Sequence, residues 1–173
     1  MTPAIQQWVE KHVASGVIPS AGPTLEVGSR DVNGTVRQFF NSAAYMGIDM
    51  EAGPGVDRVM NLHRIPLERM LAGGDGRFAK PFRTVVCLEV LEHDPSPIKA
   101  VGILRDLLMT DGVLVLSSPT TGFPEHRHPK DYWRFMKDTW TDIFFYGMEI
   151  LAFDEVRCQQ GFPGYIGAAK RLA

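Results

Sequence analysis

The chain has 173 residues, with 18 basic and 20 acidic side chains and a formal net charge of −2. Hydrophobic residues make up 45% and charged residues 22%, which are ordinary values for a globular protein. This length predicts a single domain, residues 1–173, whose core needs neither metals nor disulfides. The balanced charge argues against general nucleic-acid binding.

The cysteines and the N-terminus indicate where the protein works. Only Cys87 and Cys158 occur, and Cys87 lies inside an apolar run, which favours a buried reduced thiol. A disulfide between the two is an open alternative, but a reducing cytoplasm is the simpler expectation. The N-terminus has no apolar core of the signal-peptide type, and no window approaches 18 consecutive apolar residues. We therefore expect a cytoplasmic protein without a membrane partner.

The first half of the chain alternates between helical and extended patterns. Residues 1–20 predict an N-terminal helical cap, because Thr2-Pro3 can begin a helix and apolar residues recur at helical spacing from Ile5 to Val13. The next expected elements are strands over Thr24–Val27, Ala44–Ile48 and Val56–Leu62 and helices over Thr35 to about Asn41 and Ile65–Leu71.

The second half contains two almost wholly apolar runs, Phe82–Leu88 and Val113–Leu116, as expected for central parallel strands covered on both faces. A helix opens between them at Ser96-Pro97. Residues 121–136 are polar and aromatic without periodicity, and a loop of this length in a compact domain is usually functional, so we expect it on the substrate side. A helix over Lys137–Phe145 and strands over Glu149–Val156 and Tyr165–Lys170 follow.

This alternation predicts an α/β fold. We expect a Rossmann-like three-layer sandwich with a mostly parallel seven-stranded sheet and an antiparallel C-terminal strand pair. In such sheets the ligand lies beyond the carboxyl ends of the strands. Glu26, Asp49, Asn61 and Glu89 all lie at or near such ends.

The stretch TLEVGSRDVNG, residues 24–34, is the first indication of a ligand. It is an apolar strand that ends in a glycine turn, and Asp49 lies 21 positions after Gly28, at the tip of the next strand. A βαβ unit holds a nucleoside with this spacing, because glycine lets the backbone approach the ligand and the acid accepts the ribose hydroxyls.

Several further motifs follow in order, and together with the first they resemble one family. The chain looks like a class I S-adenosylmethionine-dependent methyltransferase of the small methyltransferase type 11 kind. The motifs that carry the resemblance are Glu26-Val27-Gly28, Gly47-Ile48-Asp49, Asn61-Leu62, LEVLEH (88–93), DGVLVLSSP (111–119) and HPKDYWRF (128–135).

The resemblance implies S-adenosyl-L-methionine as the cofactor and assigns a place to each part of it. Glu26 would lie near the amino group of the methionine part and Asp49 would accept both ribose hydroxyls. Asn61 would contact the adenine amino group through its side-chain oxygen. The residues implied in cofactor binding are Glu26, Val27, Gly28, Ser29, Arg30, Asp49, Met50 (on the adenine face), Asn61, Leu62 (through its backbone N–H), Leu88 and Glu89 (at the sulfonium end).

The implied reaction is in-line methyl transfer to an oxygen or nitrogen of a small-molecule or glycan-type acceptor, for which positioning is the largest expected contribution. The candidate general bases are His93, His126 and His128, and the candidate acceptor wall is Tyr132, Trp133 and Arg134. Each has a simpler interpretation, since loop histidines are commonly surface residues and aromatic side chains can plug the core. No metal is expected.

The glycine turn departs from the family pattern, because Arg30 and Val32 stand where glycines are usual. Arg30 either points to solvent or neutralises the methionine carboxylate, and Asn33-Gly34 can supply the left-handed turn. The alternative function is therefore a non-catalytic S-adenosylmethionine- or nucleoside-binding module of the same fold. A nicotinamide-dependent enzyme ranks third, because the G-x-G-x-x-G spacing and a second domain are missing.

Overall fold

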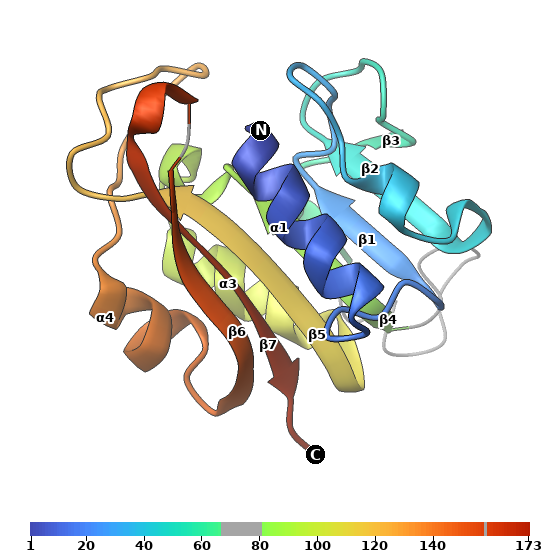
Figure 1. Ribbon diagram of the computed structural model, residues 1–173. Helices are drawn as coiled ribbons and strands as arrows, with labels where there is room; N and C mark the ends of the chain where they lie inside the picture. The colour runs from blue at the N-terminus through green and yellow to red at the C-terminus, as the bar shows by residue number, and fades with distance from the viewer. Residues whose placement is uncertain (67–80, 158) are drawn as a thin grey trace.

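The computed structural model describes residues 1–66, 81–157 and 159–173 (Figure 1). Its strands are β1 (Thr24–Val27), β2 (Tyr45–Asp49), β3 (Arg58–Val59), β4 (Phe82–Leu88), β5 (Leu108–Pro119), β6 (Met148–Arg157) and β7 (Pro163–Arg171). Its helices are α1 (Pro3–Ala14), α3 (Pro97–Asp106) and the single turn α4 (Lys137–Thr139). Short 3-10 or π turns are η1 (Arg37–Phe39), η2 (Ser42–Ala44), η3 (Leu62–Arg64), η5 (Leu91–His93), η6 (Trp140–Phe144) and η7 (Gln159–Gly161).

The strands form one sheet in the order β3-β2-β1-β4-β5-β7-β6. The pairs from β3 to β5 are parallel, and β7 lies antiparallel between β5 and β6. The predicted fold class is therefore confirmed: a mostly parallel seven-stranded sheet that ends in antiparallel strands. The carboxyl ends of β1, β2 and β4 meet at one edge, because Val27 pairs with both Ile48 and Cys87.

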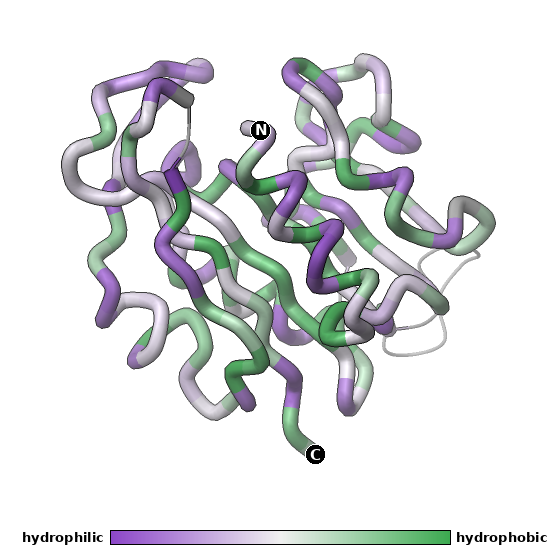
Figure 2. The backbone as a smooth tube through the Cα atoms, viewed as in Figure 1, coloured by the Kyte–Doolittle hydropathy of each residue, from purple (hydrophilic) through white to green (hydrophobic). Residues whose placement is uncertain are grey.

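The sheet separates two apolar layers, with α1 on one face and α3, α4 and η6 on the other (Figure 1). Side chains alternate along a strand, so Val85 and Cys87 of β4 pack with α3 while Val86 and Leu88 pack with α1. This alternation explains why the central strands are continuously apolar, as the green tube through the middle of the sheet shows (Figure 2). Among the described residues, no helix combines the length and apolarity needed to cross a bilayer.

The helix predicted over residues 35–41 was wrong, because only the 3-10 turn η1 forms there. Local hydrogen bonds compete with a longer helix: the Asp31 carboxylate accepts the N–H of Gly34, and the Thr35 hydroxyl accepts the N–H of Arg37. The Asn41 N–H donates to the carbonyl of Ser20, which ends the turn. The apolar spacing that predicted a helix instead reflects the burial of Val36 and Phe40.

Two other elements are shorter than predicted. The third strand covers only β3, because the Asn61 side chain caps the turn η3 that follows. The helix predicted over 137–145 is one α turn continued by the π turn η6. The helix predicted over 65–71 falls mostly outside the described residues.

Truncation of Leu114 tests the layered core. This side chain is fully buried in the middle of β5 on the α3 face. We expect Leu114→Ala to lower the free energy of unfolding by about 2–5 kcal/mol, the cost of a lost apolar contact and a cavity. The control is Ile150→Ala on edge strand β6, where the side chain is 41% exposed and a change within about 0.5 kcal/mol is expected. Equal effects in denaturant titrations would contradict the assigned core.

Candidate functional site

A cavity of about 370 Å³ opens at the carboxyl ends of β1, β2 and β4. The structure brings all eleven predicted cofactor residues to its wall, although they come from four separate stretches of the chain. They are Glu26, Val27, Gly28, Ser29, Arg30, Asp49, Met50, Asn61, Leu62, Leu88 and Glu89. Their individual roles toward a cofactor stay predictions.

The turn after β1 is held by backbone hydrogen bonds to the loop beyond β2. The N–H groups of Gly28 and Ser29 both donate to the carbonyl of Ile48, at 2.9 and 3.1 Å. The Arg30 N–H donates to the Asp49 carboxylate at 3.3 Å, and the Asp31 N–H donates to the carbonyl of Pro54 at 2.8 Å. The turn keeps a defined shape although two of the usual glycines are missing.

Glycine is needed in this turn for conformation and for space. Gly28 has φ +77°, and a Cβ there would lie 2.2 Å from a methyl carbon of Val90. Gly34, with φ +102°, supplies the second left-handed position. A Cβ on Gly47 would lie 2.4 Å from the carbonyl oxygen of Gly55. Gly28 of the turn therefore packs against the side chain of Val90, and Gly47 of the neighbouring strand packs against backbone.

Arg30 and Asp49 lie together at the rim of the cavity. The Arg30 guanidinium pairs with Glu51, so it is turned toward that carboxylate. The two Asp49 oxygens accept the N–H groups of Glu51 and Arg30, at 3.0 and 3.3 Å, which fixes the orientation of the carboxylate. Each oxygen keeps a free lone pair for a further donor.

Asn61 and Met50 form the far side of the cavity. The Asn61 side-chain oxygen, predicted to face adenine, accepts the N–H of His63 at 2.8 Å and caps η3. Its amide nitrogen lies 3.5 Å from the sulfur of Met50, whose side chain is 62% exposed. A flexible apolar side chain is therefore available at the position predicted for the adenine face.

Glu26 is a buried carboxyl in the cavity wall. It is 3% exposed and accepts the Tyr45 hydroxyl at 2.8 Å. Burial raises the pKa of Glu26 to about 7, against the opposing effects of the Tyr45 hydrogen bond and the nearby Arg37. This carboxyl is therefore poised to lose its proton when a cation arrives.

Glu89 lies at the end of β4 in a left-handed conformation, with φ +57°. Its N–H and one carboxylate oxygen both contact the Ser117 hydroxyl, at 3.1 and 2.9 Å. Burial raises the pKa of Glu89 to about 8, and the carboxylate of Glu92 adds to the rise. Glu89 is therefore a second carboxyl group in the cavity wall that is protonated near neutral pH.

The three candidate bases are placed differently. His93 and His128 line the cavity, whereas His126 lies behind His93 with 4.9 Å between the ring centroids. The His93 Nδ1 lies 2.5 Å from the carbonyl oxygen of Lys130. Within the described part of the chain, the ring of His128 has no hydrogen-bond partner. Sequence reasoning missed Glu92, a fully buried acid facing His93 and His126, although the LEVLEH motif contains it.

The predicted acceptor wall lies outside the cavity lining. Arg134 joins both ends of its own loop: it pairs with Asp131 at 2.6 Å through both terminal nitrogens and donates to the carbonyls of Phe123 and Pro124. This pairing lowers the pKa of Asp131 to about 2. Tyr132 and Trp133 are 48% and 42% exposed, and the Trp133 indole donates to the carbonyl of Asp94. Contact between these side chains and an acceptor stays a prediction.

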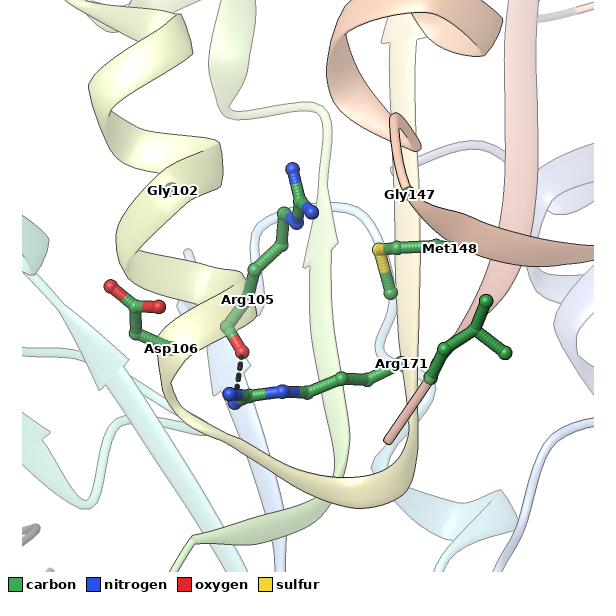
Figure 3. Close-up of a pocket in the computed structure, with 7 residues that line it drawn as sticks. Gly102, Arg105, Asp106, Gly147, Met148 and Arg171 are labelled. Carbon is green, nitrogen blue, oxygen red and sulfur yellow. Dashed lines mark hydrogen bonds between the residues drawn. The ribbon is translucent and has the colours of Figure 1, made fainter.

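A second cavity, of about 270 Å³, lies at the amino end of β5, away from these residues (Figure 3). Arg171 crosses it and donates to the carbonyls of Arg105 at 3.0 Å and Leu108 at 2.7 Å. The carbonyl of Arg105 belongs to the last turn of α3, where helical partners are missing. Arg171 therefore fastens β7 to α3, and this cavity has a structural explanation.

Gly28→Ala tests the packing of the turn. We expect the free energy of unfolding to fall by about 2–4 kcal/mol, because alanine adds left-handed strain and overlaps Val90. The Val90→Ala change removes the overlap but keeps the left-handed strain. Gly28→Ala should therefore lower the free energy of unfolding less in the Val90→Ala protein than in the wild type. Denaturant titrations of all four proteins complete the cycle. A Gly28→Ala protein as stable as the wild type would contradict this geometry.

Comparison with known proteins confirms the predicted family. The methyltransferase-domain family matches residues 7–151. The ubiquinone biosynthesis O-methyltransferase of Histophilus somni (strain 2336) is 33% identical over 85 residues, which cover 44% of this chain and 36% of that protein. The chain thus spans about a third of that relative's length.

Solved structures share the fold at low sequence identity. The Burkholderia thailandensis 1,6-didemethyltoxoflavin-N1-methyltransferase, with bound 1,6-didemethyltoxoflavin and S-adenosylhomocysteine, gives a TM-score of 0.73 at 12% identity over 98% of this chain and 79% of that one. The N-methyltransferase NodS from Bradyrhizobium japonicum WM9, in complex with S-adenosylhomocysteine, gives 0.67 at 12% identity over 98% and 88%. With the family match over most of its length, this chain belongs to the methyltransferase-domain family.

Proposed function

We propose that the protein methylates an oxygen or nitrogen of a small-molecule or glycan-type acceptor, and that the cavity at the carboxyl ends of β1, β2 and β4 holds S-adenosylmethionine. The single observation that carries this proposal is the convergence of all eleven predicted cofactor residues on one cavity wall. The Burkholderia structure, which contains both bound 1,6-didemethyltoxoflavin and S-adenosylhomocysteine, supports a small-molecule acceptor.

The charges of the cavity suit a cationic cofactor. Its wall carries the carboxyl groups of Glu26, Asp49, Glu51, Glu89 and Asp94, and Arg30, which also lines it, is paired with Glu51. S-adenosylmethionine brings an ammonium and a sulfonium, and opposite charges at close range favour binding. The sulfonium would lie near Leu88 and Glu89, and the ribose would lie on Asp49.

Methyl transfer needs only the cofactor, the acceptor and a base. The acceptor's lone pair forms the new bond to the methyl carbon as the carbon–sulfur bond breaks. The electron pair of that bond goes to sulfur and leaves neutral S-adenosylhomocysteine. The acceptor proton passes to a base, for which His128 is best placed, because it lines the cavity and its ring has no partner within the described residues. Positioning of acceptor and methyl group supplies most of the rate enhancement.

The setting is a further part of the proposal. We place the enzyme in a reducing cytoplasm, supported by Cys87, which is a buried free thiol in β4. The alternative, a non-catalytic binding module with the same cavity, predicts cofactor binding without product formation.

Calorimetry followed by an activity screen separates these possibilities. The wild-type protein should bind one equivalent each of S-adenosylmethionine and S-adenosylhomocysteine, and candidate metabolites should then yield S-adenosylhomocysteine. The His128→Ala variant should bind the cofactor normally and lose turnover by about 100-fold or more, the usual contribution of a general base. Absence of binding at millimolar cofactor would refute the proposal, and binding without turnover would support the non-catalytic module.

Replacement of Asp49 tests the ribose site. We expect Asp49→Ala to weaken cofactor binding by about 1–3 kcal/mol, the range for hydrogen bonds to charged groups. Asp49→Asn is the control for geometry, since one amide oxygen can still accept the N–H of Glu51 or Arg30. It should bind with intermediate affinity in calorimetry. Unchanged affinity in both variants would show that the ribose is held elsewhere.

The raised pKa of Glu26 predicts a pH dependence. In the free protein this carboxyl is protonated below about pH 7, whereas a bound ammonium favours the carboxylate and lowers its pKa. Binding then releases the Glu26 proton on the acid side, so the Glu26 contribution should raise affinity with pH up to about 7, by as much as about tenfold per unit, and level off above. Calorimetry in buffers of different ionisation enthalpy measures the release. Glu26→Gln should release fewer protons than the wild type, with Glu89 as the remaining source, and an unchanged release in that variant would show that Glu26 does not supply the proton.

A further inference from the structure

Glu92 is a fully buried acid with one unsatisfied oxygen. It lies in η5, is 0% exposed, and accepts the Ser118 hydroxyl at 3.0 Å through Oε2. Its Oε1 has no hydrogen-bond partner among the described residues. A buried carboxylate oxygen without a hydrogen-bond partner is costly, so a cation beside it is strongly favoured.

Two imidazole nitrogens face this oxygen from different parts of the chain. The Nε2 atoms of His93 and His126 lie 3.6 and 3.7 Å from Glu92 Oε1, and the three atoms all lie within 4.8 Å of one another. Ligands at 2.0–2.1 Å from a tetrahedral zinc ion are separated by about 3.3 Å. The three atoms are therefore close to the spacing that one shared ion would impose.

The opposite ring nitrogens both have polar partners, and that of His93 is held as in metal-binding histidines. His93 Nδ1 lies 2.5 Å from the carbonyl oxygen of Lys130, which requires Nδ1 to carry the proton and leaves the lone pair on Nε2. His126 Nδ1 lies 3.5 Å from a carboxylate oxygen of Asp131 and 3.5 Å from a guanidinium nitrogen of Arg134, which fixes that carboxylate. Such partners orient the imidazole and raise its affinity for a metal.

We propose that Glu92 Oε1, His93 Nε2 and His126 Nε2 bind one divalent transition-metal ion, for which Zn²⁺ is the best match. Two imidazoles and one carboxylate suit zinc and leave one tetrahedral position for water or a substrate oxygen. The ion joins the loop 121–136 to η5, and it borders the cofactor cavity because His93 lines that cavity. Binding of the ion does not depend on the proposed methyl transfer.

The full-length protein, first treated with chelator, tests the site by titration with Zn²⁺ in a calorimeter and with Co²⁺ in a visible spectrometer. The wild type should bind one equivalent, with ligand-field bands of four- or five-coordinate Co²⁺. His126→Gln and Glu92→Gln should each weaken binding by at least about tenfold, the smallest effect expected for a lost metal contact. The matched control is His128→Gln, which alters the same loop outside the cluster and should bind as the wild type does.

The His126 side chain is 36% exposed, so we expect the His126→Gln variant to fold. Circular dichroism and thermal unfolding establish that each variant is folded, and His126→Gln carries the test if Glu92→Gln does not fold. Absence of saturable binding by the wild type would leave a simple ion pair between Glu92 and a protonated histidine, and would overturn the proposal. Equal binding by the wild type and His126→Gln would locate the ion elsewhere and also overturn it.

Discussion

The close packing of the turn after β1 is the constraint on which the rest of the site depends. Gly28 and Ser29 both donate to the carbonyl of Ile48, and no Cβ can be accommodated at Gly28 or Gly47. These contacts hold the ends of β1 and β2 together, where Asp49 and Glu26 line the same cavity. The missing family glycines do not disrupt this turn, because its left-handed positions are Gly28 and Gly34 and Arg30 has its own partner at the rim. The altered motif is therefore compatible with a formed cavity.

Burial and charge oppose each other in that cavity. Burial raises the pKa of Glu26 and Glu89 to about 7 and about 8, so both can hold protons near neutral pH. A cationic cofactor reverses this, because its charge favours the ionised carboxylates. Neutral carboxyls in the free protein avoid the repulsion that several buried negative charges would cause, and the cofactor itself supplies the charge that ionises them. Binding and proton release are thus coupled by the same residues.

The sequence predicted those parts that depend on short-range pattern and topology. Continuous apolar runs predicted the central strands, and the rule that parallel strands end at one edge brought Glu26, Asp49 and Glu89 together. The helix predicted at 35–41 was wrong. The spacing of Val36 and Phe40 indicates that they are buried, but it does not reveal the local side-chain hydrogen bonds that prevent a helix there. Sequence reasoning also missed that Glu92 lies between two histidines. This arrangement depends on how the loop 121–136 folds back over η5. The contacts of Arg134 with Phe123, Pro124 and Asp131 hold the loop in that path.

The central claim is that the cavity at the carboxyl ends of β1, β2 and β4 holds the cofactor despite the altered turn. Backbone amide chemical shifts of the labelled protein during titration with S-adenosylhomocysteine test it most directly. The account predicts saturable shifts at Gly28, Asp49 and Glu89, and none at Gly102 or Gly147, which line the distant second cavity. Shifts confined to the second cavity, or no saturable shift at millimolar ligand, would contradict it.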